Sequence, residues 1–209
     1  IDFDATAEGE GFADVANAAI TDPIVITVPG AAADGVYNAT LTVTNTTTGC
    51  VSVAATNITV TINPNPTITL DVSPTTCSGV DTSLGYTGTT GSPDRYVIDF
   101  DATAEGEGFV DVPLTVLPGS PIPITVPAAA AGTYNGTITV SNNTTSCVGT
   151  ATPFTITVND NPTITVGPNP EVCSGPLVAN LDVTGTTGGP DQYNIDFDAT
   201  AEGEGFADV

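Results

Sequence analysis

The chain has 209 residues, of which 24 are acidic and one is basic, giving a formal net charge of −23. This charge excludes the phosphate-neutralising surface that nucleic-acid binding needs, and it opposes adsorption to an anionic membrane. The apolar runs are no longer than strands, so we expect no membrane insertion in this segment. Threonine, valine, alanine, glycine, asparagine and proline are abundant, as in proteins built from β-strands and turns.

The stretch IDFDATAEGEGF begins at Ile1, Ile98 and Ile195, so the chain repeats itself at an interval of 97 residues. An interval of this length indicates tandem modules, each about the size of one β-sandwich domain. We therefore predict the C-terminal part of one module, a complete module and the N-terminal part of the next, over residues 1–65, 66–161 and 162–209.

Neither partial module holds all the strands of a closed core. We expect the missing strands to come from neighbouring modules of the same chain or from a second chain. The proline-containing linkers, residues 63–66 and 159–162, predict stiff junctions because proline fixes its own φ and extends the residue before it.

Alternating apolar residues predict the strands of the complete module, at residues 68–72, 84–86, 96–100, 122–126, 134–140 and 154–158. The acidic stretch 101–111 is predicted to be a loop. The alanine run 128–131 is also predicted to be a loop, because it is too short to nucleate a helix between Pro127 and Gly132. Short strands separated by turns at about eight to twelve residues are typical of an immunoglobulin-like sandwich, so the predicted fold class is all-β.

Two sequence patterns resemble modules of the polycystic-kidney-disease (PKD) type. The first is Tyr-x-Ile-Asp-Phe-Asp at Tyr96–Asp101, and the second is Gly132-Thr133-Tyr134 followed by Ile138 and Val140. Cys-Ser-Gly at Cys77 and Thr-Thr-x-Cys at Cys147 are similar to PKD-like modules of secreted Bacteroidetes surface proteins. Isoleucine replaces the family's tryptophan, and alanine-threonine replaces glycine-aspartate. The resemblance implies a stalk, adhesin arm or filament body.

Four cysteines, two per module, allow three disulfide pairings. The repeat favours a bond between Cys77 and Cys147, with Cys50 and Cys173 pairing outside this segment. Bridges between adjacent modules are the rival prediction, and metal binding is disfavoured because the thiols are isolated and histidine is absent. Disulfide bonding predicts an oxidising, extracellular or cell-surface location.

Each copy of the repeated stretch carries acids in the pattern D-x-D-x3-E-x-E-x3-D. Hard oxygen ligands beside flexible glycines suit calcium, although the spacing is not that of an EF-hand. The competing interpretation is a solvated acidic edge that prevents strand pairing between molecules. The candidate calcium ligands are Asp2, Asp4, Glu8, Glu10, Asp99, Asp101, Glu105, Glu107, Asp196, Asp198, Glu202 and Glu204.

Catalysis is not expected. Paired carboxylates suit glycoside hydrolysis, but the chain has few aromatic residues, no tryptophan and no histidine. We predict an extracellular structural repeat protein whose partners are neighbouring copies of itself. The alternative is an adhesin module that binds carbohydrate or a surface through exposed loops. Six asparagines also match the glycosylation pattern N-x-[ST]: Asn38, Asn45, Asn57, Asn135, Asn142 and Asn143.

Overall fold

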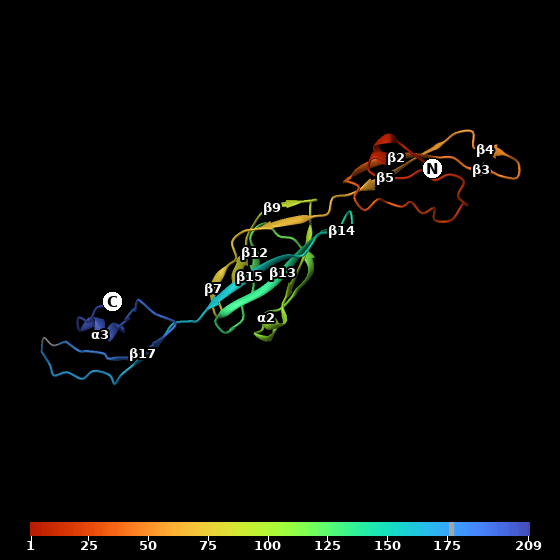
Figure 1. Ribbon diagram of the computed structural model, residues 1–209. Helices are drawn as coiled ribbons and strands as arrows, with labels where there is room; N and C mark the ends of the chain where they lie inside the picture. The colour runs from red at the N-terminus through yellow and green to blue at the C-terminus, as the bar shows by residue number, and fades with distance from the viewer. Residues whose placement is uncertain (176–177) are drawn as a thin grey trace. The chain divides into compact units, whose positions relative to one another are not determined.

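The computed structural model describes residues 1–175 and 178–209, and it is built mainly of strands (Figure 1). Two compact units are distinguished. Unit 1 comprises Ile1–Thr67, Thr89–Asp94 and Val140–Thr150, and unit 2 comprises Ile68–Gly88, Arg95–Thr139 and Ala151–Val209. The predicted module boundaries at residues 65 and 161 stay a prediction. The predicted part 162–209 includes residues 176 and 177, which lie outside the described residues.

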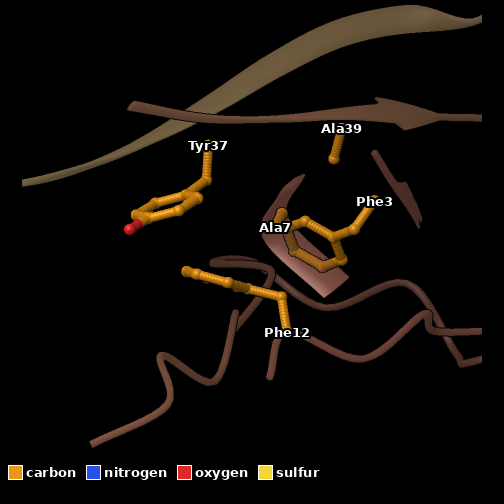
Figure 2. Close-up of a cluster of buried hydrophobic side chains, with 5 residues drawn as sticks. All are labelled: Phe3, Ala7, Phe12, Tyr37 and Ala39. Carbon is orange, nitrogen blue, oxygen red and sulfur yellow. The ribbon is translucent and has the colours of Figure 1, made fainter. Parts of the chain in front are cut away.

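Most of unit 1 comes from the first third of the chain. The elements there are β1 (Asp2–Phe3), α1 (Ala5–Gly9), β2 (Gly35–Leu41), β3 (Thr44–Asn45), β4 (Cys50–Val51) and β5 (Thr56–Ile62). Strands β1, β2 and β5 form an antiparallel sheet with β2 in the centre, and β3 and β4 form a hairpin. The side chains of Phe3, Ala7, Phe12, Tyr37 and Ala39 form a buried cluster, which Figure 2 shows.

The middle of the chain holds most of the strands. Its elements are β6 (Thr67–Leu70), β7 (Thr75–Cys77), β8 (Thr82–Leu84), β9 (Tyr86–Thr90), β10 (Arg95–Phe100), α2 (Ala102–Gly106), β11 (Val112–Val116), β12 (Ile122–Ile124), β13 (Gly132–Asn142), β14 (Cys147–Val148) and β15 (Thr152–Asn159). A six-stranded sheet has the order β11-β10-β13-β15-β7, with β14 paired to β13. Strand β7 runs parallel to β15, whereas β10 pairs antiparallel with β11, and β13 pairs antiparallel with β14 and β15.

Two further strand pairs, β12 with β8 and β6 with β9, complete the middle of the chain. Alternation along β10, β13 and β15 sends every second residue inward, as the sequence pattern predicts. Leu84 on β8 and Ile122 on β12 are fully buried, as are Ile98, Ile138 and Ile156. Burial of such branched side chains is the main stabilising contribution in a fold of short strands.

The last part of the chain contributes β16 (Thr163–Val166), β17 (Val183–Thr187) and α3 (Ala199–Gly203) to unit 2. Strands β16 and β17 pair antiparallel, and the Thr163 and Thr187 hydroxyls are hydrogen-bonded across the pair at 2.5 Å. Strands β6 and β9 carry the equivalent bond between Thr67 and Thr90. Each helix of the described residues has only five residues, and none is long and apolar enough to cross a membrane.

The prediction of a strand-rich fold is confirmed, with corrections in detail. The acidic stretch after Phe100 begins with helix α2 rather than a loop, because Asp101 caps it. Strand β11 follows that helix, and β7 lies between the strands predicted at 68–72 and 84–86. The alanine run 128–131 lies outside any helix or strand, as predicted.

A core substitution tests the packing of the middle of the chain. Replacing Leu84, which is fully buried, by alanine should lower the free energy of unfolding by about 2–5 kcal/mol, because it removes apolar contacts and leaves a cavity. Val110→Ala is the matched control, since Val110 is 77% exposed and the other copies have alanine there. The control should change stability by no more than about 0.5 kcal/mol. Denaturant unfolding measures both, and equal losses would contradict this packing.

Candidate functional site

The repeated stretch, taken through its last aspartate, is called the motif below. In the middle copy it forms a strand followed by a short capped helix. Asp101 is the N-cap of α2: its Oδ1 accepts a hydrogen bond from the backbone N–H of Ala104 at 2.8 Å. Aspartate is favoured at this position because its carboxylate satisfies a helix N–H that has no partner within the helix. Its second oxygen, Oδ2, accepts a hydrogen bond of 2.7 Å from the side-chain amide of Asn135 on β13.

The first copy makes the same contacts with its own residues. Asp4 accepts hydrogen bonds from the Ala7 backbone at 2.9 Å and from the Asn38 side chain at 3.0 Å. The third copy caps α3 with Asp198, which accepts from Thr200 and Ala201. Asp4 and Asp101 therefore each join a helix start to a neighbouring strand.

Hydrogen bonding lowers the pKa of both aspartates below the ordinary value of 3.8. The Asn135 side chain is the main cause for Asp101, followed by the backbone N–H of Ala104. For Asp4 the backbone N–H of Ala7 comes first and the Asn38 side chain second. Both carboxylates accept hydrogen bonds in their charged form, so they are acceptors rather than acids.

Further acids of the motif also accept hydrogen bonds from the backbone. Asp111 accepts from the N–H of Phe100 at 2.8 Å, and Asp14 and Asp208 make the same bond with Phe3 and Phe197. These bonds hold the end of each copy against the strand residues at its start.

The second glutamate of the motif reaches a more distant segment. Glu107 accepts from the backbone of Ala130 at 3.1 Å, and Glu10 accepts from Ala33 at 3.0 Å. The Tyr134 hydroxyl donates to the Ala130 carbonyl at 2.6 Å, and burial followed by the charge of Glu107 raises the pKa of Tyr134.

The apolar residues of the motif lie on its inner side. Ala104 and Ala7 are fully buried, so only a small side chain fits on that face of each helix. Phe109 contacts Phe100 and Tyr134, with ring centroids 5.1 and 5.0 Å apart. In the first copy Phe12 lies between Phe3 and Tyr37, each at 5.0 Å, as Figure 2 shows. These tilted aromatic contacts stabilise the fold beyond the area they bury.

The predicted calcium ligands therefore fall into two groups: some accept hydrogen bonds within the protein, and the others are exposed. Within residues 1–175 and 178–209, no three of the histidine, cysteine, aspartate and glutamate side chains are placed to hold one metal ion. Asp4, Asp101, Asp198, Glu10 and Glu107 accept hydrogen bonds from the protein. The first aspartate and first glutamate of each copy are exposed, at Asp2, Glu8, Asp99, Glu105, Asp196 and Glu202. Glu204 follows α3 as its C-cap and is exposed. Calcium binding stays a prediction.

An open hollow recurs beside the motif. In the middle copy it has a volume of about 580 Å³ and is lined by Asp99, Asp101, Asn135, Thr137 and Thr155 together with phenylalanine side chains. In the first copy the equivalent hollow, of about 410 Å³, is lined by Asp2, Asp4, Asn38, Thr40 and Thr59 among others. Carboxylate, amide and hydroxyl groups gathered around a hollow can form hydrogen bonds to a hydroxyl-rich ligand.

The asparagines of this hollow were predicted as glycosylation acceptors and not as structural partners. Asn38 and Asn135 follow their aspartates Asp4 and Asp101 by the same 34 residues, as the bonds Asn38–Asp4 and Asn135–Asp101 show. This constant spacing is the feature of the sequence that indicates a pairing between the asparagine and the aspartate. A spacing alone does not reveal which residues face each other, because the path of the intervening chain decides this.

All four cysteines are free thiols in the structure, which therefore does not contain the predicted Cys77–Cys147 bond. Cys77 ends β7, opposite Asn159, and is exposed. Cys147 begins β14, opposite Asn142, and its Sγ lies 3.9 Å from the carbonyl oxygen of Asn63 and 3.8 Å from that of Thr145. Cys50 and Cys173 are exposed, which leaves them accessible to partners, and the pairing of all four stays a prediction.

Comparison of the sequence with protein-family models gives no match, and comparison with curated proteins gives none either.

Replacing Asp101 by alanine should lower the melting temperature by several degrees at pH 6, because α2 loses its cap and Asn135 loses its acceptor. Asp99→Ala is the control, since Asp99 is exposed on the same strand. A folded-state pKa below 3.8 means that the Asp101 contribution is present above that pH and is lost as pH falls through the folded pKa. The difference between wild type and variant should therefore shrink toward pH 3. A difference that is the same at pH 6 and pH 3 would contradict a role for the charged carboxylate.

Removal of divalent metal ions tests whether the acidic residues of the motif bind calcium. We expect thermal melts with and without excess EDTA to give the same midpoint, because hydrogen bonds within the protein already occupy Asp4 and Asp101. A midpoint that falls with EDTA and returns with added calcium would favour the calcium prediction over the solvated acidic edge.

Proposed function

We propose that the chain is part of an extracellular structural repeat protein that forms a cell-surface stalk, adhesin arm or filament. Its modules are immunoglobulin-like, of the PKD-like kind, and about 97 residues long, with a complete module at residues 66–161 between partial modules at 1–65 and 162–209. Its partners are neighbouring copies of the same module. No catalytic role is part of the proposal.

The observation that carries this proposal is the use of the motif's invariant acids for internal contacts. Asp4 with Asn38 and Asp101 with Asn135 make the same link between helix and strand, and Glu10 and Glu107 make the same loop contact. Residues that recur because each module needs them for its own packing favour a structural array. Residues that contact a varying ligand are expected to differ between modules.

The residues around the first linker also support a structural role. Pro66 is fully buried. Gly91 has a φ of +66°, and a Cβ added there would lie 2.8 Å from the Cα of Pro66. The close approach of these two backbones therefore requires glycine. Gly188 and Pro162 repeat the arrangement, with a φ of +65° and a distance of 2.9 Å. A linker residue held against a turn in this way limits the local freedom of the chain.

A second candidate function is recognition of carbohydrate, and the recurring polar hollow favours it. Asp99, Asn135 and Thr137 present groups that can bind sugar hydroxyls, and the same types of group recur at Asp2, Asn38 and Thr40. Repetition of a weak site along an array would raise the overall affinity through multivalency. The structural proposal is preferred because Asn135 and Asp101 already bind each other.

Antibodies raised against the purified chain should label intact, unpermeabilised cells that produce it, and electron microscopy should show the label along filaments or stalks. Pre-immune serum is the control for non-specific labelling. Label that appears only after permeabilisation would contradict the proposal. Binding of the purified chain to a glycan array, lost in a Thr137→Val variant, would favour carbohydrate recognition instead.

A further inference from the structure

Asn135 and Gly136 form the only asparagine-glycine pair in the sequence. In such a pair the glycine nitrogen can lose its proton and bond to the side-chain amide carbon of the asparagine, because glycine has no side chain to obstruct the approach. The amide group leaves as ammonia, and the product is a cyclic succinimide. Water then opens the ring at either carbonyl, which leaves aspartate or isoaspartate in place of asparagine.

The packing around β13 explains why both residues of this pair are needed. A Cβ added at Gly136 would lie 2.6 Å from Cζ of Phe154, its partner on β15. Phe154 is buried and packs edge-on against Phe100, with ring centroids 5.8 Å apart, so the close packing leaves its ring little room to move aside. The side-chain amide of Asn135 donates to Oδ2 of Asp101 at 2.7 Å.

The first copy keeps the asparagine and its aspartate without the reactive pair. Asn38 donates to Asp4 in the same way, and Ala39 follows it in the sequence. Ala39 pairs with Ile58 on β5, whereas the glycine of the middle copy pairs with Phe154. The larger aromatic ring is therefore the physical reason that the middle copy has glycine after its asparagine.

Asn135 is accessible to water, but its conformation opposes ring closure. Its side chain is exposed, and together with Gly136 it lines the open hollow beside the motif. Asn135 lies within β13, where the backbone is extended, and its amide is bonded to Asp101. Ring closure requires the amide carbon to turn toward the next backbone nitrogen, so the strand and this hydrogen bond must first open locally.

We propose that Asn135 is a deamidation site, which reacts when its hydrogen bond to Asp101 opens. The folded strand protects the amide, and each opening exposes it to a reaction that needs only water. The product places a second carboxylate beside Asp101, so an acceptor replaces the donor and the two like charges repel. The hydrogen bond cannot form again.

The consequence is a permanent weakening of the link between α2 and β13. The Asn135 amide is the main cause of the lowered pKa of Asp101, so its loss also removes a favourable contact of the charged carboxylate. Deamidation therefore records that this part of the chain has opened. The inference goes beyond the proposed function and is independent of it, because the same reaction would occur in a structural or a carbohydrate-binding protein.

The test follows the charge at Asn135 while the purified chain is incubated at mildly alkaline pH, where the glycine nitrogen loses its proton more readily. Ion-exchange chromatography separates the more negative product, and peptide mapping by mass spectrometry assigns the change to a residue. Isoaspartate content alone is not a sufficient measurement. Asp34 precedes Gly35, and an aspartate-glycine pair can isomerise without gaining charge.

Four variants separate the possible causes. Asp101→Ala removes the acceptor, and Asp99→Ala is the matched control at an exposed aspartate of β10. Leu84→Ala weakens the core without touching the hydrogen bond, so it separates global unfolding from local opening. Gly136→Ala combined with Phe154→Ile gives the alanine-isoleucine pair of the first copy.

Circular dichroism confirms that each variant is folded before incubation. If Asp101→Ala is unfolded, Asp101→Asn takes its place. Asparagine also caps helices, and with its oxygen on the helix it presents only an NH₂ group to Asn135, which cannot accept a hydrogen bond.

Folded wild type should deamidate at Asn135 far more slowly than the same chain unfolded in denaturant. Asp101→Ala should react faster than wild type by roughly tenfold, because loss of a charged hydrogen bond raises the open population by about that factor. Asp99→Ala and Leu84→Ala should react at close to the wild-type rate, and the double variant should stay unmodified. The separated deamidated wild type should melt several degrees below the unmodified protein.

Three results would overturn the inference. The first is a rate at Asn135 that is the same in the folded and the unfolded wild type. The second is an acceleration in Leu84→Ala or Asp99→Ala as large as that in Asp101→Ala, which would make the hydrogen bond irrelevant. The third is a deamidated protein whose melting midpoint is unchanged, which would show that a second carboxylate is tolerated beside Asp101.

Discussion

The carboxylate of Asp101 connects the end of β10, the start of α2 and strand β13. One oxygen caps α2, and the other binds the Asn135 side chain on β13. These charge-assisted hydrogen bonds set the direction in which the chain leaves β10. Because the chain turns there, Ala104 and Phe109 enter the interior, and Phe109 packs between Phe100 and Tyr134. The packing of the motif depends on this one side chain.

Hydrogen bonds of the same kind explain why several other positions of the repeated stretch are acidic. Asp111 and Glu107 accept backbone hydrogen bonds in the middle copy, and Asp14 and Glu10 do so in the first. The backbone offers N–H donors at these places, and a carboxylate satisfies them at short range. Exposed acids such as Asp99 and Glu105 have no such role among the described residues, and their charge acts on solubility and on encounters between chains.

Burial of the branched side chains depends on which strand pairs are covered by a further layer. A strand pair buries its apolar face only when another layer covers it. Leu84 lies opposite Ile122 in the middle of the chain and both are fully buried, whereas Leu181 and Ile24 are 45% and 44% exposed. The free cysteines on exposed surfaces, Cys50 and Cys173, lie in the same two outer parts of the chain.

The sequence by itself determined the strand-rich character of the protein, the strands centred on Ile98, Ile138 and Ile156, and the loop at the alanine run. These follow from local properties, because alternation of apolar residues and helix propensity act over a few neighbours. The tertiary structure decided that Asn135 is the partner of Asp101 and that β7 joins β15 in parallel. These features join residues from 34 to about 80 positions apart, and no local pattern encodes which distant groups meet. Pairing at such separations depends on how the whole chain buries its apolar residues, which only the folded structure shows.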